Sequence, residues 1–158
     1  MESGRQRVIF VCTHNSARSQ MAEGMLRAWG GDRFEVVSAG TEATRVRPEA
    51  IRVMDEIGID ISKQTSKTLE PFLGDAFSWL VTVCDQAKEA CPTIPGVAQQ
   101  AHWSIDDPAG VDGDEDARLQ AFRAARDALR DRIHMFLLVA GRDDLPPPEA
   151  QRIGDESG

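Results

Sequence analysis

Short apolar runs alternate with amphipathic stretches along this chain of 158 residues. The apolar runs are rich in β-branched side chains and are bounded by polar residues, which is typical of buried strands. They lie at residues 7–11, 34–38 and 79–83, and a weaker run at residues 101–103 predicts a short fourth strand.

The stretches between these runs have helical periodicity. Residues 19–29 predict a first helix, and Pro48 fits the first turn of a second helix that ends before Gly58. A long amphipathic helix is predicted over residues 114–139. Strands that alternate with helices predict an α/β fold, in which a four-stranded parallel sheet carries helices on both faces.

Composition and charge narrow the classes of protein to which the chain can belong. The length predicts a single domain over residues 1–140, and the acidic, proline-rich tail at 141–158 is expected to be disordered. A net charge of −8 argues against a nucleic-acid partner. The apolar runs are too short to span a membrane and no signal peptide is evident, so we expect a cytoplasmic monomer without a membrane partner.

A cysteine stands at the end of the first predicted strand, and an arginine stands just before the first predicted helix. In a turn of this kind, backbone N–H groups and the helix N-terminus attract an anion, and the planar fork of Arg18 can grip two of its oxygens. The same positive field favours the thiolate form of Cys12. The turn therefore predicts a nucleophile and an oxyanion cradle in one loop, formed by Thr13, His14, Asn15, Ser16, Ala17, Arg18 and Ser19.

Taken alone, a lone cysteine at a strand end is usually a small buried hydrophobe. The neighbouring polar residues favour the chemical interpretation. Ser16 and Ser19 can donate to a thiolate or to a carbonyl, and Asn15 tolerates the left-handed backbone that a tight cradle requires. The glycines and the Lys-Ser/Thr pair of a nucleotide-binding loop are missing.

Two further cysteines flank a helix-favouring segment after the third predicted strand. If the segment were helical, Cys84 and Cys91 would lie roughly 10 Å apart, and a disulfide needs Cα atoms within about 7 Å. The pair can therefore bond only if the segment unwinds, as in a redox switch. Zinc is a competing interpretation, but the spacing is not Cys-x-x-Cys and His102 lacks a matching partner.

A third feature is the turn Asp106-Asp107-Pro108. Such a turn is ordinary by itself. Held over an oxyanion cradle, however, a carboxylic acid in this turn can protonate a leaving oxygen.

Together these motifs resemble the arsenate reductases that are built on the low-molecular-weight phosphotyrosine phosphatase fold. The resemblance spans residues 6–138 in order and spacing and is carried by CTHNSARSQMAEG, Ser38-Ala39-Gly40, VTVCDQAKEACP and HWSIDDPAG. The pair of cysteines in the third motif separates the reductases from the phosphatases.

The resemblance implies a relay of three sulfurs. Arsenate binds the loop and Arg18, the Cys12 thiolate attacks arsenic, and Asp107, which stands immediately before the proline, protonates the departing oxygen. Cys84 then attacks Cys12, arsenite leaves, and Cys91 resolves the bridge by forming a Cys84–Cys91 disulfide. No cofactor is bound, and thioredoxin, supplied with electrons from NADPH by thioredoxin reductase, reduces the final disulfide.

Three positions depart from the family pattern. Ala109 stands where the phosphatases have a tyrosine, and Ala17 replaces a cysteine that some reductases have in the loop. Some members also bind potassium through positions that match Asn15, Glu23, Ser38 and an aspartate. The aspartate position is Lys67 here, so we expect its ammonium to bridge to Glu23 and no metal to be required; the alternative is that Lys67 is a solvated surface residue.

Two other functions stay open at this point. A phosphatase acting on small phosphate esters would begin with the same thiolate attack, and a redox or oxyanion sensor would bind the anion without turnover. Mycothiol or glutaredoxin could also replace thioredoxin as the reductant.

Overall fold

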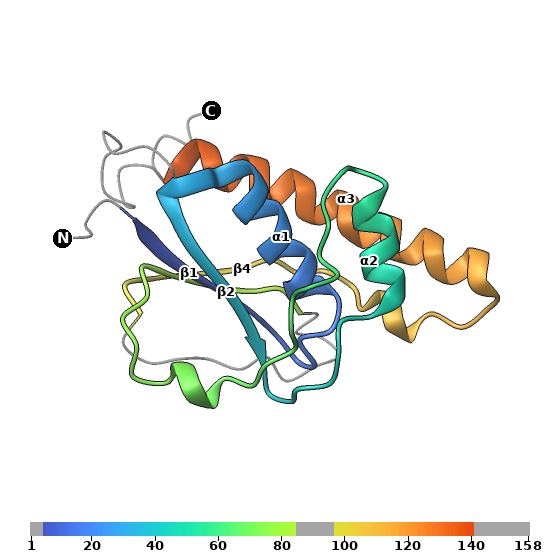
Figure 1. Ribbon diagram of the computed structural model, residues 1–158, viewed down its shortest axis with the longest axis horizontal. Helices are drawn as coiled ribbons and strands as arrows, with labels where there is room; N and C mark the ends of the chain where they lie inside the picture. The colour runs from blue at the N-terminus through green and yellow to red at the C-terminus, as the bar shows by residue number, and fades with distance from the viewer. Residues whose placement is uncertain (1–4, 85–96, 141–158) are drawn as a thin grey trace.

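A four-stranded parallel sheet forms the centre of the protein, as the computed structural model shows for the residues that it describes, 5–84 and 97–140 (Figure 1). The strands lie in the order β2-β1-β3-β4, and all three neighbouring pairs are parallel. The predicted α/β class and its four-stranded parallel sheet are thereby confirmed. The strands are β1 (Gln6–Cys12), β2 (Phe34–Gly40), β3 (Trp79–Thr82) and β4 (Gln99–His102).

The three α-helices follow the predicted stretches closely. Pro48 occupies the first turn of α2, and Gly58, just beyond this helix, has a φ of 82° that suits glycine. The helices are α1 (Arg18–Gly30), α2 (Pro48–Asp55) and α3 (Glu115–Ala140), and the 3-10 helices are η1 (Gly31–Arg33), η2 (Glu70–Phe72) and η3 (Pro108–Gly110).

The two faces of the sheet are covered differently. Val8 and Phe10 of β1 pack into one core cluster with residues of α1, α2 and α3, which lie together on one side of the sheet (Figure 1). Because successive side chains of a strand alternate, Ile9 and Val11 point to the other face. There they pack in a second cluster with residues that include Phe72 of η2. Within the described residues, α-helices therefore cover one face and a 3-10 helix covers part of the other.

The fourth strand differs from its predicted position. It runs from Gln99 to His102 rather than over 101–103, because its first residues pair with Trp79 and Leu80 of β3. The sequence of this edge strand is polar and lacks β-branched residues, so its start leaves little trace in the hydrophobic pattern.

The carboxyl ends of the two central strands bring the predicted site together. Val11 pairs with Thr82, and the amide of Val83 donates to the carbonyl of Val11 at 2.9 Å. Cys12 ends β1 and Cys84 follows β3, so both buried cysteines lie at the same edge of the sheet. Among the described residues, no helix has the length and apolar character needed to cross a membrane. The proposed tail, 141–158, lies outside the described residues.

Candidate active site

The loop between β1 and α1 surrounds a buried thiol. Cys12 is 2 % exposed, and its Sγ lies 2.9 Å from the Oγ of Ser19 in the first turn of α1. This contact places a hydroxyl where it can donate to a thiolate. Ser19 itself is completely buried, which fixes the geometry of the pair.

Arg18 links the loop to the turn that carries the predicted acid. Its guanidinium is 3 % exposed, donates from Nη1 to the carbonyl of Ile105 at 3.0 Å, and approaches Asp107 Oδ2 with Nη2 at 3.7 Å. Asp107 also accepts a hydrogen bond from the amide of Ala109 at 2.9 Å, which orients its carboxylate at the start of η3. Asp106 is exposed, and the carboxylate that approaches the arginine is that of Asp107.

Asn15 organises the loop from inside. Its φ of 50° confirms the predicted left-handed backbone, and its side chain is completely buried. The amide nitrogen donates to Ser19 Oγ at 2.8 Å and to Ser38 Oγ at 3.0 Å. The amide oxygen accepts from Gln20 Nε2 at 2.9 Å and from the backbone of Lys67 at 2.7 Å. One side chain therefore ties β2, α1 and residue 67 to the hydroxyl that contacts Cys12.

Two glutamines that the sequence did not single out extend this network. Gln20 is completely buried and donates to the backbone carbonyls of Asn15 and Thr65, at 3.0 and 2.9 Å. Gln64 donates in turn to Gln20 Oε1 at 2.8 Å. A glutamine directly after the loop, at the start of an otherwise apolar helix face, was the only sequence signal for this role.

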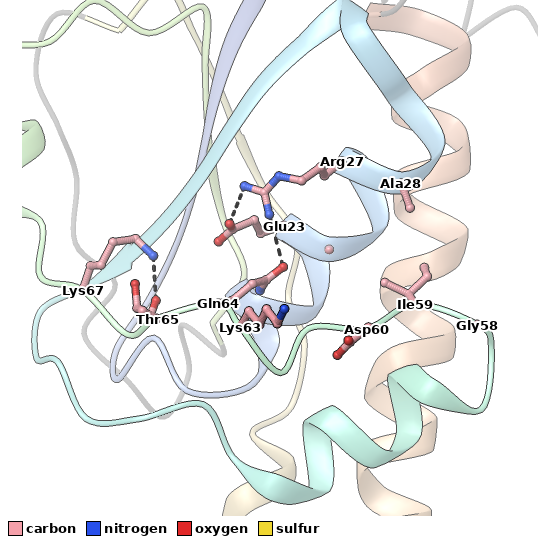
Figure 2. A pocket seen from close by; sticks show the side chains of 11 residues that line it. Glu23, Arg27, Ala28, Gly58, Ile59, Asp60, Lys63, Gln64, Thr65 and Lys67 are labelled. Atoms are coloured by element: carbon pink, nitrogen blue, oxygen red, sulfur yellow. Dashed lines mark hydrogen bonds and ion pairs between the residues drawn. The ribbon is translucent and has the colours of Figure 1, made fainter.

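The expected bridge between Lys67 and Glu23 is wrong. Lys67 Nζ donates to the carbonyl of Thr65 at 2.6 Å, and the ion pair of Glu23 is with Arg27, one turn later on α1, at 2.5 Å (Figure 2). Arg27 is favoured because an i, i+4 neighbour reaches Glu23 directly. The second carboxylate oxygen of Glu23 accepts from Ser38 at 2.5 Å.

Lys67 is not a fully solvated surface residue either. Burial is the main cause that lowers the pKa of its ammonium. The charge of Glu23 raises this pKa and that of Arg27 lowers it, both by less than burial does. It lines a cavity of about 580 Å³ together with Glu23 and Arg27 (Figure 2). Its contribution to the loop is made through the backbone amide that binds Asn15.

The segment that follows β2 holds the outer side of the loop. The carbonyl of Thr13 accepts from the amide of Glu42 at 3.1 Å, and the carbonyl of Ser16 accepts from the amide of Arg47 at 2.9 Å. Gly40 makes this contact possible, since a Cβ atom there would lie 2.7 Å from the Thr13 carbonyl oxygen and 2.8 Å from that of Cys12.

The cysteines occur in different redox states. Cys12 is a free thiol, whereas Cys84 is buried and disulfide-bonded, so the bridge of Cys84 is not to Cys12. Cys91 lies outside the described residues. The zinc alternative gains no support from His102, whose Nδ1 lies 2.6 Å from Thr82 Oγ1, and the described residues contain no cluster of three or more metal-binding side chains.

A buried thiol beside an arginine and a carboxylate, at the carboxyl edge of a parallel sheet, defines a cysteine-dependent enzyme of the α/β class. The chain belongs to the low molecular weight phosphotyrosine protein phosphatase family, whose model matches residues 7–145.

Similar proteins within this family are arsenate reductases. The chain is 44 % identical over 129 residues to the arsenate reductase of Halalkalibacterium halodurans, a match that covers 82 % of this chain and 93 % of that protein. It superposes on an arsenate reductase in the phosphate-binding state with a TM-score of 0.73 and 35 % identity, over 84 % and 97 % of the two chains. A thioredoxin-dependent arsenate reductase from Corynebacterium glutamicum matches with a TM-score of 0.57 and 25 % identity, over 85 % of this chain and 65 % of that one.

Proposed function

We propose that this protein is an arsenate reductase that passes the oxidising equivalents of arsenate through Cys12, Cys84 and Cys91. Its relatives named arsenate reductase support this activity. The observation that favours a reductase over a phosphatase is Cys84, which is buried at the end of the strand next to Cys12 and takes part in a disulfide. A phosphatase needs only the first thiol.

The first step forms a bond between sulfur and arsenic. Arsenate binds to the backbone amides of residues 13–19 and to the guanidinium of Arg18. The Cys12 thiolate attacks arsenic, and Asp107 gives a proton to the departing oxygen, which leaves as water. Arg18 Nη2 lies 3.7 Å from Asp107 Oδ2, so the proposed acid stands next to the arginine that would bind the anion. Asn15, Ser19, Glu23 and Ser38, with the backbone of Lys67, keep the loop in shape.

The second step reduces arsenic. The Cys84 thiolate attacks the sulfur of Cys12, the S–As bond breaks, and its electron pair stays on arsenic, which leaves as arsenite. Cys91 then attacks Cys84, so that the Cys12–Cys84 bridge becomes a Cys84–Cys91 bridge and the Cys12 thiol is restored. A free Cys12 beside a disulfide-bonded Cys84 is the state that this sequence of steps predicts at its end.

The external reductant in this proposal is thioredoxin, which takes its electrons from NADPH through thioredoxin reductase. The thioredoxin-dependent relative supports this choice over mycothiol or glutaredoxin. Such a cycle requires a reducing compartment and therefore the cytoplasm.

A coupled assay tests the relay. Arsenate, thioredoxin, thioredoxin reductase and NADPH are mixed with the protein, and the loss of NADPH and the formation of arsenite are both followed. Cys91→Ser should release one arsenite per protein molecule and then stop. Sustained turnover by this variant would rule out the relay.

Two further variants separate the other functions. Cys84→Ser should lose arsenate turnover but keep any hydrolysis of small phosphate esters, because that reaction uses only Cys12. Asp107→Asn should slow both reactions by roughly 10²- to 10⁴-fold. An oxyanion sensor would form no arsenite at all, and Asp107→Asn would leave its anion affinity almost unchanged.

A further inference from the structure

A cavity opens beside the loop on the side of the segment that follows β2. Its volume is about 360 Å³, and His14 and Ser16 of the loop and Asp107 of the acid turn contribute to its wall. Arg45 and Arg47 line the same cavity. The cavity next to the loop is thus bounded by two arginines that the proposed reaction does not use.

Among the described residues, Arg45 has no partner for its charge and Arg47 has only a long ion pair. Arg45 is exposed and forms no ion pair with any residue in the described ranges. The Nε of Arg47 is buried and has no hydrogen-bond partner among the described residues. Its nearest carboxylate, Glu49, is 3.9 Å away and is shared with Arg118 at 3.6 Å. At this distance the carboxylate makes no hydrogen bond to the buried Nε and compensates the charge of Arg47 only in part.

The segment that carries these arginines is fixed to the loop. The amide of Arg47 donates to the carbonyl of Ser16 at 2.9 Å, and Thr44 Oγ1 donates to the carbonyl of His14 at 3.3 Å. Arg47 also precedes α2 directly, so its backbone is held by the helix start. The backbone of residues 44–47 is therefore fixed against the loop, and both arginines project from it beside the same cavity.

The overall charge makes such a position useful. With a net charge of −8, the protein as a whole repels an anionic substrate. Acidic groups also stand near the entrance, since Asp107 lines the cavity and Glu42 lies 3.6 Å from His14. Arsenate is an anion at neutral pH, whereas arsenite leaves as an uncharged acid. Local positive charge at the mouth would attract the substrate without retaining the product.

We propose that Arg45 and Arg47 form an anion-recruiting entrance that draws the tetrahedral oxyanion to the loop and sets its KM. This role rests on the proposed arsenate reductase function and adds two residues that determine substrate affinity. The chemical steps at Cys12 do not involve them, so the entrance should affect kcat/KM and leave kcat nearly unchanged.

Steady-state kinetics with arsenate test the entrance. Arg45→Ala and Arg47→Ala should each lower kcat/KM at low ionic strength by roughly three- to tenfold, with kcat within twofold of the wild type. Arg45→Lys should restore most of the loss. The advantage of the wild type should shrink as salt is added, because screening weakens attraction at a distance.

Lys63→Ala is the matched control. Lys63 is exposed, forms no ion pair among the described residues, and lines the cavity that contains Lys67 (Figure 2). Its replacement by alanine removes one positive charge, as each arginine variant does, but away from the proposed entrance. It should leave kcat/KM within twofold. An equal effect of Lys63→Ala, or no effect of Arg45→Ala, would overturn the entrance.

A binding measurement separates this proposal from the proposed function. In a Cys84→Ser, Cys91→Ser background, inorganic phosphate should protect Cys12 from iodoacetamide, and Arg45→Ala should raise the half-protecting phosphate concentration roughly three- to tenfold. If the wild type forms no arsenite but this shift is found, the entrance stands and the reductase function fails. If arsenite is formed and protection is unchanged, the entrance is wrong.

Discussion

Replacing Asn15 by glycine should destabilise the protein more than any other single change of a polar side chain in the loop. The residue is completely buried, and its φ of 50° is one that glycine adopts without strain. Asn15→Gly therefore removes the side-chain amide while leaving the backbone conformation accessible.

The magnitude follows from the four hydrogen bonds of this amide. At about 1 kcal/mol for each buried hydrogen bond, the upper limit is about 4 kcal/mol. Ser19, Ser38 and Gln20 each keep another partner, so their share of the loss is reduced. The amide of Lys67 loses its only acceptor among the described residues, which alone costs about 1–3 kcal/mol. We expect a loss of about 2–4 kcal/mol in the free energy of unfolding.

Two related variants separate the causes. Asn15→Ala should cost about 1 kcal/mol more than Asn15→Gly, because an alanine at positive φ is strained. Asn15→Asp keeps the acceptor for Lys67 but replaces the donor to Ser19 and adds a negative charge near Cys12. Alkylation of Cys12 by iodoacetamide at pH 7 should then be slower in the aspartate variant than in the glycine variant, since the added charge disfavours the thiolate.

Urea unfolding of the reduced proteins, followed by tryptophan fluorescence, measures these differences if the slope of the transition is constant. Thr41→Gly is the control, because it also introduces a glycine shortly after a central strand, here β2, and removes only one exposed hydrogen bond, from Thr41 Oγ1 to the Thr13 carbonyl at 3.0 Å. If Asn15→Gly falls within about 1 kcal/mol of Thr41→Gly, the buried network does not carry the stability that we assign to it.

Two further predictions concern packing and pH. Gly40→Ala should lower the free energy of unfolding by about 1–3 kcal/mol, because the new methyl group would meet backbone atoms of the loop. The same change should weaken the protection of Cys12 by phosphate. Gly110→Ala is the control, since its methyl group would face open space and should be neutral in both assays. Hydrogen bonds from Arg123 and then Arg126 lower the pKa of Glu56 from 4.5 to about 2. Because the pKa is lower in the folded state, ionised Glu56 stabilises the protein above pH 4.5, and this stabilisation is lost as the pH falls from 4.5 towards 2. The urea midpoints of the wild type and Glu56→Gln should therefore differ at pH 7 and converge between pH 4.5 and 2. A gap that stays constant with pH would contradict the ion-pair explanation.

The elements that the sequence predicts well are those whose signal is local. The apolar runs of β1 and β3 and the periodicity of α3 depend on neighbouring residues, and the apolar positions of the long helix, such as Phe122 and Leu129, are indeed buried. The left-handed backbone of Asn15 was equally predictable, because few residue types tolerate it.

The second layer of the site was not predictable in the same way. Gln64 is far from Gln20 in sequence, and nothing local indicates that the two side chains meet. The wrong prediction of a Lys67–Glu23 bridge has the same cause, because it also depends on which distant residues the fold brings together. The resemblance to a potassium site of the family made Glu23 the expected partner of Lys67, but Arg27 on the same helix pairs with Glu23 instead, and only the fold decides between two cations.

The carbonyl contacts of the loop explain how an acidic chain can offer hydrogen-bond donors to an anion. In a trans peptide the C=O of one residue and the N–H of the next point in opposite directions, and no described peptide is cis. The carbonyls of Thr13 and Ser16 accept hydrogen bonds from the segment that follows β2. The amides of His14 and Ala17 therefore point away from that segment. These donors are fixed by backbone geometry and need no side-chain charge, so Arg18 can supply the charge at the reacting anion while Arg45 and Arg47 act only on its approach.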